Sequence, residues 1–186
     1  MGEPIAVLDT ETTWSNRLMS VGAVIADGET LQPVDKRYYI LPAAGLEGGM
    51  YSAALYIGGV QPDLECPRSE AMEDLKGILH EYGVEKLFAY NARFDYGLLH
   101  ELRSFQWFDI MGLAAYRQYN HAISDYADCY ATGRLKRGFG VESIYRMLSR
   151  DWDYYETHNA LFDAMDELAI MQMLGHGLEE YRRAKI

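Results

Sequence analysis

The chain has 186 residues, of which 49% are hydrophobic and 24% charged, a composition typical of a folded globular protein. Its formal net charge of −11 argues against a broad basic face for duplex nucleic acid, although a carboxylate-rich metal site would itself add negative charge. No apolar run approaches the ~20 residues of a membrane span and no signal peptide is recognised, so we expect no membrane association and a cytoplasmic location. Cys66 and Cys129 match no metal-binding spacing, and we expect free thiols in a reducing compartment.

The first part of the chain is predicted to form three strands joined by short turns, the pattern of an antiparallel meander. These strands are expected at residues 5–9, 19–26 and 34–41. Asp27 and Gly28 form a strong turn signal between the second and third strands. Residues 42–68 are rich in glycine, proline and small side chains and are predicted to form an irregular connection. A helix with apolar residues on one face follows from Ser69.

From residue 86 onward, predicted strands and helices alternate, which indicates parallel βαβ units. Strands are expected at 86–90 and 107–111, and helices at 94–102, 111–119, 141–148 and 157–174. A helical tail that frays is expected at about 177–186. The order predicts an α/β fold in one domain over 1–186, with its core at about 4–174. Its mixed five-stranded sheet would join an antiparallel meander to parallel strands, with flanking helices.

Two carboxylates follow the apolar part of the first strand, in the stretch AVLDTETTW from Ala6 to Trp14. Asp9 and Glu11 are one residue apart, so their side chains point to the same side of an extended chain. Side by side they repel, and each raises the pKa of the other unless a cation lies between them. The alternative interpretation is a polar strand end in which Asp9 caps a turn.

Two later segments supply similar groups. In YNARFDYGLL, Asp95 falls near the first turn of the helix after strand 86–90, and in HNALFDAM, Asp163 lies five residues after His158. Each taken alone could be an ordinary helix-cap or first-turn residue. Together, four carboxylates and one imidazole form a ligand set that suits Mg²⁺ or Mn²⁺. Two such ions can clamp the attacking and leaving oxygens of a phosphodiester, and a histidine can accept a proton from water.

The segments LDTETT, YNARFD and HNALFDA occur in the order of three exonuclease motifs, and the chain from about Pro4 to Leu174 resembles the DnaQ-like, or DEDDh, 3′–5′ exonucleases. The resemblance implies an RNase H-like fold and release of nucleoside 5′-monophosphates from the 3′ end of single-stranded DNA or RNA. It also implies two divalent cations, Mg²⁺ or Mn²⁺. A polymerase or a second copy of the chain is a candidate partner, because some relatives are polymerase-bound subunits or dimers.

The resemblance also assigns roles to individual residues. Asp9, Glu11, Asp95 and Asp163 would be the metal ligands, with Asp9 shared between both ions. His158 would be the general base that takes a proton from the attacking water.

Several neighbouring residues are candidate contacts of the terminal nucleotide. The resemblance implies this role for Thr10, Thr12 and Asn91, partly through the backbone. Trp14 stands where many relatives have glycine, and it could either stack on a base or pack under the loop that follows the strand. Phe94 could form a pocket wall or belong to the core, and the core is favoured.

Other polar features have two interpretations each. The basic cluster RLKRG, from Arg134 to Gly138, could follow phosphates or form a solvated loop. Tyr154 and Tyr155 could gate the site or simply pack. Three further carboxylates are interpreted as structural or solvated: Asp109, Asp166 and Glu167.

Two functions compete with an exonuclease. A binding or regulatory module would use the fold without turnover, but such a protein would usually have lost a ligand, and this chain keeps all five residues. A nucleotide or sugar-phosphate phosphatase could use the same metals. A preference for mononucleotides over oligomers would indicate the phosphatase.

Overall fold

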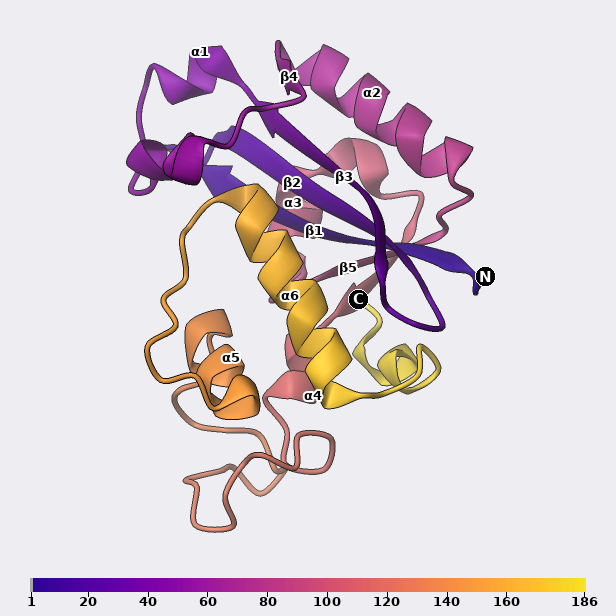
Figure 1. Cartoon of the computed structure of the whole chain (residues 1–186), viewed down its shortest axis with the longest axis vertical. Helices are drawn as coiled ribbons and strands as arrows, with labels where there is room; N and C mark the ends of the chain where they lie inside the picture. Colours follow the sequence, from indigo (N-terminus) through magenta and orange to yellow (C-terminus); the bar gives the residue numbers. More distant parts are fainter. Residues whose placement is uncertain (1) are drawn as a thin grey trace.

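The fold was analysed in a computed structural model that describes residues 2–186. A mixed six-stranded sheet lies at the centre, in the order β4-β3-β2-β1-β5-β6 (Figure 1). The antiparallel part consists of β1 (Pro4–Thr12), β2 (Leu18–Asp27) and β3 (Pro33–Ile40). Parallel pairing adds β4 (Leu64–Glu65), β5 (Lys86–Ala89) and β6 (Gln106–Asp109). The predicted fold class is confirmed.

The sheet has one strand more than the five predicted. The additional strand, β4, has two residues and lies within the segment predicted to be an irregular connection. It pairs with the end of β3 through Tyr39 and Ile40. Two residues are too short for periodicity to reveal, so only the pairing partner identifies them as a strand.

β1 lies in the middle of the sheet, between β2 and β5. Its apolar residues Ile5 to Leu8 are 0% exposed. A central strand that is covered on both faces needs a continuous apolar run rather than an alternating one. The run stops at Asp9, so the chain leaves the core with Asp9 and Glu11 at the carboxyl end of the strand.

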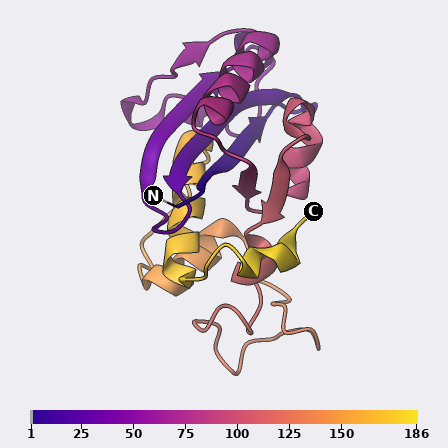
Figure 2. The same ribbon diagram turned by 90° about the vertical axis from the view of Figure 1, so that its right-hand side faces the viewer.

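Helices cover both faces of the sheet. Neighbouring tyrosines of β3 show this, because successive side chains of a strand point to opposite faces. The Tyr38 hydroxyl accepts a hydrogen bond from Asn159, next to α6 (Ala160–Leu174), whereas the Tyr39 hydroxyl donates to Asp74 in α2 (Arg68–Glu81). Figures 1 and 2 show α5 (Val141–Ser149) on the α6 side and α3 (Arg93–Leu98) on the opposite side.

The remaining elements are short. They are α1 (Pro42–Gly45), α4 (Met111–Ala114) and the 3₁₀ turns η1 (Ser52–Ala54), η2 (Ile57–Gly59), η3 (His100–Leu102) and η4 (Glu180–Ala184). The helix predicted to reach residue 119 therefore ends at Ala114, and the one predicted at 94–102 is divided into α3 and η3. Cys66 and Cys129 are free thiols. Within residues 2–186, no helix is both long and apolar enough to cross a bilayer.

The tail predicted to be helical contains the short 3₁₀ turn η4, and its residues pack against β5 and β6. Tyr181 is 0% exposed and its ring meets the ring of Phe88 edge-on, with centroids 5.3 Å apart. The Ile186 N–H donates to the Trp107 carbonyl at 3.1 Å, and Lys185 forms a β-bridge with Phe108. The tail is ordered because it docks on β6, a long-range contact that local sequence does not reveal.

A glycine permits α6 to approach the sheet closely. Gly22 of β2 is paired with Asp9 of β1. A Cβ atom at Gly22 would lie 2.1 Å from the Ala160 carbonyl oxygen and 2.4 Å from the Leu161 nitrogen. Both atoms belong to the backbone and cannot rotate away. The first turn of α6 can therefore lie beside the carboxyl end of β1 only if residue 22 has no side chain.

We predict that Gly22→Ala destabilises the protein by at least ~1–3 kcal/mol, the usual cost of overpacking a close backbone contact. Gly77→Ala is the matched control, because nothing lies within 4 Å of a Cβ at that position in α2. Alanine should stabilise the α2 helix there by roughly 0.5–1 kcal/mol. Denaturant unfolding followed by circular dichroism measures both changes. Equal stability of Gly22→Ala and the wild type would show that α6 does not need this close approach.

Candidate active site

The carboxyl ends of β1 and β5 lie at one edge of the sheet, because the two strands are parallel. A cleft of about 350 Å³ opens there. Asp9, Glu11 and Asp95 line it together with Trp14 and Phe94. Three of the four predicted metal ligands therefore share one cleft.

Asp95 lies in the first turn of α3 and is 2% exposed. The Thr10 hydroxyl donates a hydrogen bond to Asp95 Oδ1 at 2.6 Å, and this bond ties β1 to α3. The turn before α3 has a left-handed residue, Asn91, at φ +59°. The backbone N–H groups of Asn91 and Met111 both donate to Asp109 Oδ1, at 2.9 and 3.0 Å. Asp109 therefore has the structural role that the sequence suggested.

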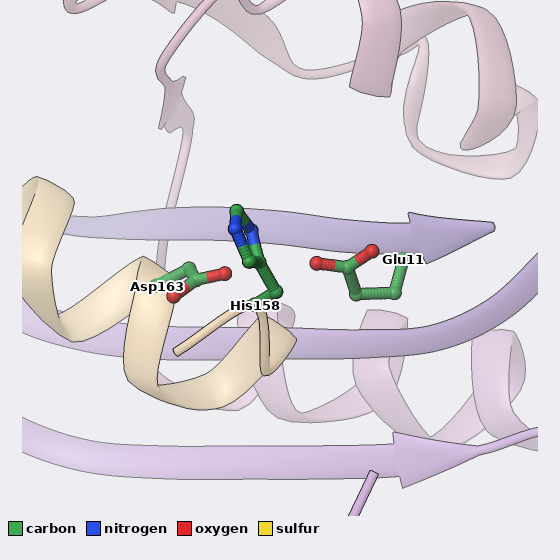
Figure 3. Close-up of side chains that lie close together, drawn as sticks. All are labelled: Glu11, His158 and Asp163. Atoms are coloured by element: carbon green, nitrogen blue, oxygen red, sulfur yellow. The ribbon is translucent and has the colours of Figure 1, made fainter. Parts of the chain in front are cut away.

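His158 and Asp163 come from the other face of the sheet, at the start of α6. Ligand atoms of Glu11, His158 and Asp163 all lie within 4.8 Å of one another. Figure 3 shows the His158 ring between the Asp163 and Glu11 carboxylates. Because Glu11 also lines the cleft, the five predicted catalytic residues converge at the end of β1.

Asn159 fixes this end of α6 and was not recognised from the sequence. Its Oδ1 accepts hydrogen bonds from the Leu161 and Phe162 N–H groups, which makes it the N-cap. Its Nδ2 donates to the Tyr38 hydroxyl at 3.0 Å and to the Ala54 carbonyl at 2.9 Å. The helix predicted from residue 157 therefore begins at Ala160. The signal was an asparagine directly before the apolar periodic run.

Burial and mutual repulsion both disfavour charge on these carboxylates. Burial is the main cause that raises the pKa of Glu11 to about 8, and the charge of Asp163 adds to it. Burial likewise raises the pKa of Asp163 to about 8 and that of Asp95 to about 7. The pKa of Asp9 is also raised by burial, and then by four neighbouring carboxylates. In contrast, burial lowers the pKa of His158, so its imidazole is neutral at pH 7.

Glu167 is a further carboxylate of the site, beyond the four predicted. It is 1% exposed, and its Oε2 accepts a hydrogen bond from the Tyr90 N–H at 2.9 Å. This bond joins α6 to the end of β5, so Glu167 has a structural role. That role is one of the two interpretations, structural or solvated, made from the sequence. Glu167 is also the strongest charged neighbour that raises the pKa of Asp9. Its spacing of four residues from Asp163 on one helix face was the available signal.

The donor set fits hard divalent cations. Within residues 2–186, Asp9 Oδ2 is buried without a hydrogen-bond partner. No lysine or arginine in that range forms an ion pair with Asp9, Glu11, Asp95 or Asp163. Buried carboxylates that lack protein cations are stable in the charged form only when another cation compensates them. Oxygen donors with one imidazole are what Mg²⁺ or Mn²⁺ would meet here.

The candidate nucleotide contacts lie at the mouth of the cleft. Trp14 is 68% exposed, so packing under the loop is excluded. Its backbone N–H donates to the Gly48 carbonyl at 3.1 Å. Phe94 is 45% exposed, so the preference for a core position is wrong. Thr12 and Asn91 also line the cleft, whereas the Thr10 hydroxyl is committed to Asp95.

The basic cluster is partly paired with an acidic side chain. Lys136 pairs with Asp128 at 2.8 Å, which neutralises part of the cluster.

The two tyrosines before His158 differ in their surroundings. The Tyr154 hydroxyl donates to Asp166 Oδ2 at 2.5 Å and its ring stacks on Tyr145, so Tyr154 is a packing residue and does not gate the site. Tyr155 is 72% exposed.

We predict that the metal-free protein loses stability as the pH rises from about 4 to about 8. Unfolded Asp and Glu titrate near pH 4, whereas Glu11 and Asp163 titrate at about 8 in the folded protein. The folded state therefore binds more protons in this window, and its stability falls as they dissociate. Asp163→Asn keeps a hydrogen-bond acceptor but removes one charge. In EDTA this variant should melt above the wild type at pH 8 but not at pH 4, and equal melting temperatures at pH 8 would contradict the prediction.

We also predict that Mg²⁺ or Mn²⁺ raises the melting temperature of the wild type at pH 8. A ligand that binds only the folded state stabilises it in proportion to the logarithm of its concentration. The shift should be much smaller in Asp163→Asn, which lacks one ligand charge. Thermal unfolding at several concentrations of Mg²⁺ or Mn²⁺ measures the shift in melting temperature. Equal shifts in both proteins would place the cation elsewhere.

Known structures share this arrangement of strands and helices. Exonuclease X in complex with 5′ overhanging duplex DNA is 20% identical with a TM-score of 0.56, and the match covers 97% of this chain and 99% of that one. The nuclease domain of 3′hExo, a DEDDh family member bound to rAMP, is 14% identical with a TM-score of 0.61, over 95% of this chain and 94% of that one. The zinc-bound E. coli ExoI–ssDNA complex is 12% identical with a TM-score of 0.57, over 94% of this chain and 40% of that one.

No protein-family model and no curated protein sequence matches the chain. At these identities, the structural likeness concerns the fold. The chain has the RNase H-like fold of these 3′-exonucleases, a mixed sheet with helices on both faces.

Proposed function

We propose that the protein is a metal-dependent 3′–5′ exonuclease that removes nucleoside 5′-monophosphates from single-stranded DNA or RNA. The observation that carries the proposal is the convergence of Asp9, Glu11, Asp95, Asp163 and His158 at the end of β1. Three elements far apart in the sequence deliver these groups to one place. The shared fold supports the same conclusion, because the similar solved structures are those of 3′-exonucleases.

Asp9, Glu11 and Asp163 would hold one divalent cation, and Asp9 and Asp95 a second. Bound Mg²⁺ or Mn²⁺ would activate water and offset the charge that develops on the phosphate. The protein contributes fixed positions: Thr10 restrains Asp95, and Thr157 restrains Asp163 through a hydrogen bond of 3.3 Å. Fixed ligands lower the cost of assembling the site when substrate arrives.

His158 is suited to act as the general base. Burial keeps the imidazole neutral at pH 7, so a ring nitrogen can accept a proton. The ring takes this proton from the attacking water, whose oxygen forms the new bond to phosphorus. The 3′ oxygen of the preceding nucleotide leaves with the electron pair of the broken P–O bond. The products are a nucleoside 5′-monophosphate and a strand that is one residue shorter.

The cleft suits the end of a single strand. Its volume of about 350 Å³ is at the small end of the range typical of ligand sites. The exposed rings of Trp14 and Phe94 at its mouth offer stacking faces for an unpaired base. Bound rAMP and single-stranded DNA in two of the similar structures support a substrate of this class.

We predict that the purified protein with Mg²⁺ or Mn²⁺ shortens 5′-labelled single strands from a free 3′ end but not from a blocked one. Asp9→Asn and Asp163→Asn should abolish this activity, and His158→Gln should lower it by about 10²-fold, the usual scale for a lost general base. Asp74→Asn is the matched control, because Asp74 bonds to Tyr39 on the opposite face of the sheet.

Three outcomes would contradict this proposal. Tight oligonucleotide binding without cleavage would indicate a binding module. Faster hydrolysis of mononucleotides than of oligomers would indicate a phosphatase. Full activity of Asp163→Asn would remove that residue from the site.

A further inference from the structure

The imidazole of His158 lies against an aromatic ring from a different part of the chain. The rings of Tyr51 and His158 have centroids 3.8 Å apart and planes 17° apart, so they are stacked face to face. Tyr51 also lines the cleft, as Glu11 does. The stacked contact therefore lies at the boundary between the cleft and the Glu11–His158–Asp163 cluster. On the cluster side, the imidazole lies between the two carboxylates, and ligand atoms of the three residues are within 4.8 Å of one another (Figure 3).

The loop that carries Tyr51 is fixed to the end of β1. The backbone N–H of Trp14 donates to the Gly48 carbonyl at 3.1 Å. A Cβ at Gly49 would lie 2.3 Å from the Thr12 carbonyl oxygen, so the backbone of the loop touches the strand there. The Ser52 hydroxyl donates to the Gly49 carbonyl at 2.7 Å and accepts from its N–H at 2.9 Å. Tyr51 is thus held at a fixed place relative to Glu11.

His158 itself needs support from its surroundings. Its backbone has φ +55°, a conformation that is uncommon for a residue with a Cβ. The ring is only half-buried, and residues 150–157 before it form no helix or strand. The following residue, Asn159, donates to the Ala54 carbonyl, which lies three residues after Tyr51. One loop therefore restrains both the backbone beside His158 and the face of its ring.

We propose that Tyr51 is a positioning residue that holds the His158 imidazole in the orientation of a general base. The inference rests on the proposed function and deepens it. Stacked rings attract each other beyond the area that they bury, so this contact favours one orientation of the imidazole. The contact uses the ring rather than the hydroxyl, so phenylalanine would preserve it.

The kinetic test compares Tyr51→Phe and Tyr51→Leu on a single-stranded oligonucleotide. Tyr51→Phe should keep kcat within about twofold. Tyr51→Leu should lower kcat by about 10-fold with little change in KM, because a misoriented base slows the chemical step and leaves substrate binding unchanged. Tyr56→Leu is the control, because Tyr56 lies on the same loop and bonds to Glu65 instead. The same substitutions are then made in His158→Gln, where Tyr51→Leu should have no further effect.

Two kinetic outcomes would overturn the proposal. A rise in KM with unchanged kcat would show that Tyr51 contacts the substrate and not the base. An equal loss of activity from Tyr51→Leu in the wild type and in His158→Gln would show that it acts independently of His158.

A second measurement needs neither substrate nor metal. Proton–carbon NMR of histidine-labelled protein resolves the ring signals of the five histidines, and His158→Gln identifies those of His158. A stacked aromatic ring shifts these signals upfield. They should stay in place in Tyr51→Phe and move downfield in Tyr51→Leu, and unchanged signals in Tyr51→Leu would overturn the proposal even in an active enzyme. Shifted signals in a protein without nuclease activity would instead refute the proposed function while the contact itself stands.

Discussion

The crowding of carboxylates at the end of β1 is the constraint on which the rest of the site depends. Burial raises the pKa of Asp9, Glu11, Asp95, Asp163 and Glu167. The charges of Asp95 and Asp163 raise the pKa of the other three further. These carboxylates would not stay close together on their own, because their negative charges repel one another. The surrounding scaffold must bear this cost, and divalent cations would relieve it. A site of this kind trades stability of the metal-free protein for the ability to bind cations where chemistry is needed.

The scaffold meets this cost with contacts between distant segments. Gly22 admits the backbone of α6 beside β2 at the level of Asp9. Asn159 ties the start of α6 to β3 and to the loop after α1. Glu167 connects α6 to the end of β5, and Thr10 connects β1 to α3. Each contact is small, but together they fix three elements whose acidic groups would otherwise separate.

The strongly acidic composition is compatible with a nucleic-acid substrate because the functional charge is local. The net charge of −11 includes the site carboxylates, which bound cations would offset. Asp128 pairs with Lys136 and Arg137, so it offsets one of the three positive charges of the basic cluster. Recognition would instead rely on the cleft and on the exposed rings of Trp14 and Phe94. Stacking of this kind is tolerant of base sequence.

Local sequence determined the fold class, most of the strands and helices, and the identity of the acidic and imidazole residues. Burial of β1 follows from its continuous apolar run, and the convergence of Asp9 with Asp95 follows from parallel strands that end at one edge. These signals are local, so one sequence contains them. Only the tertiary structure decided that Tyr51 stacks on His158, that Glu167 accepts a hydrogen bond from the Tyr90 N–H and that the C-terminal tail docks on β6. These contacts join residues separated by 77 positions or more, as Tyr90 and Glu167 are. Their formation depends on how packed elements approach one another, and periodicity and capping signals carry no information on that approach.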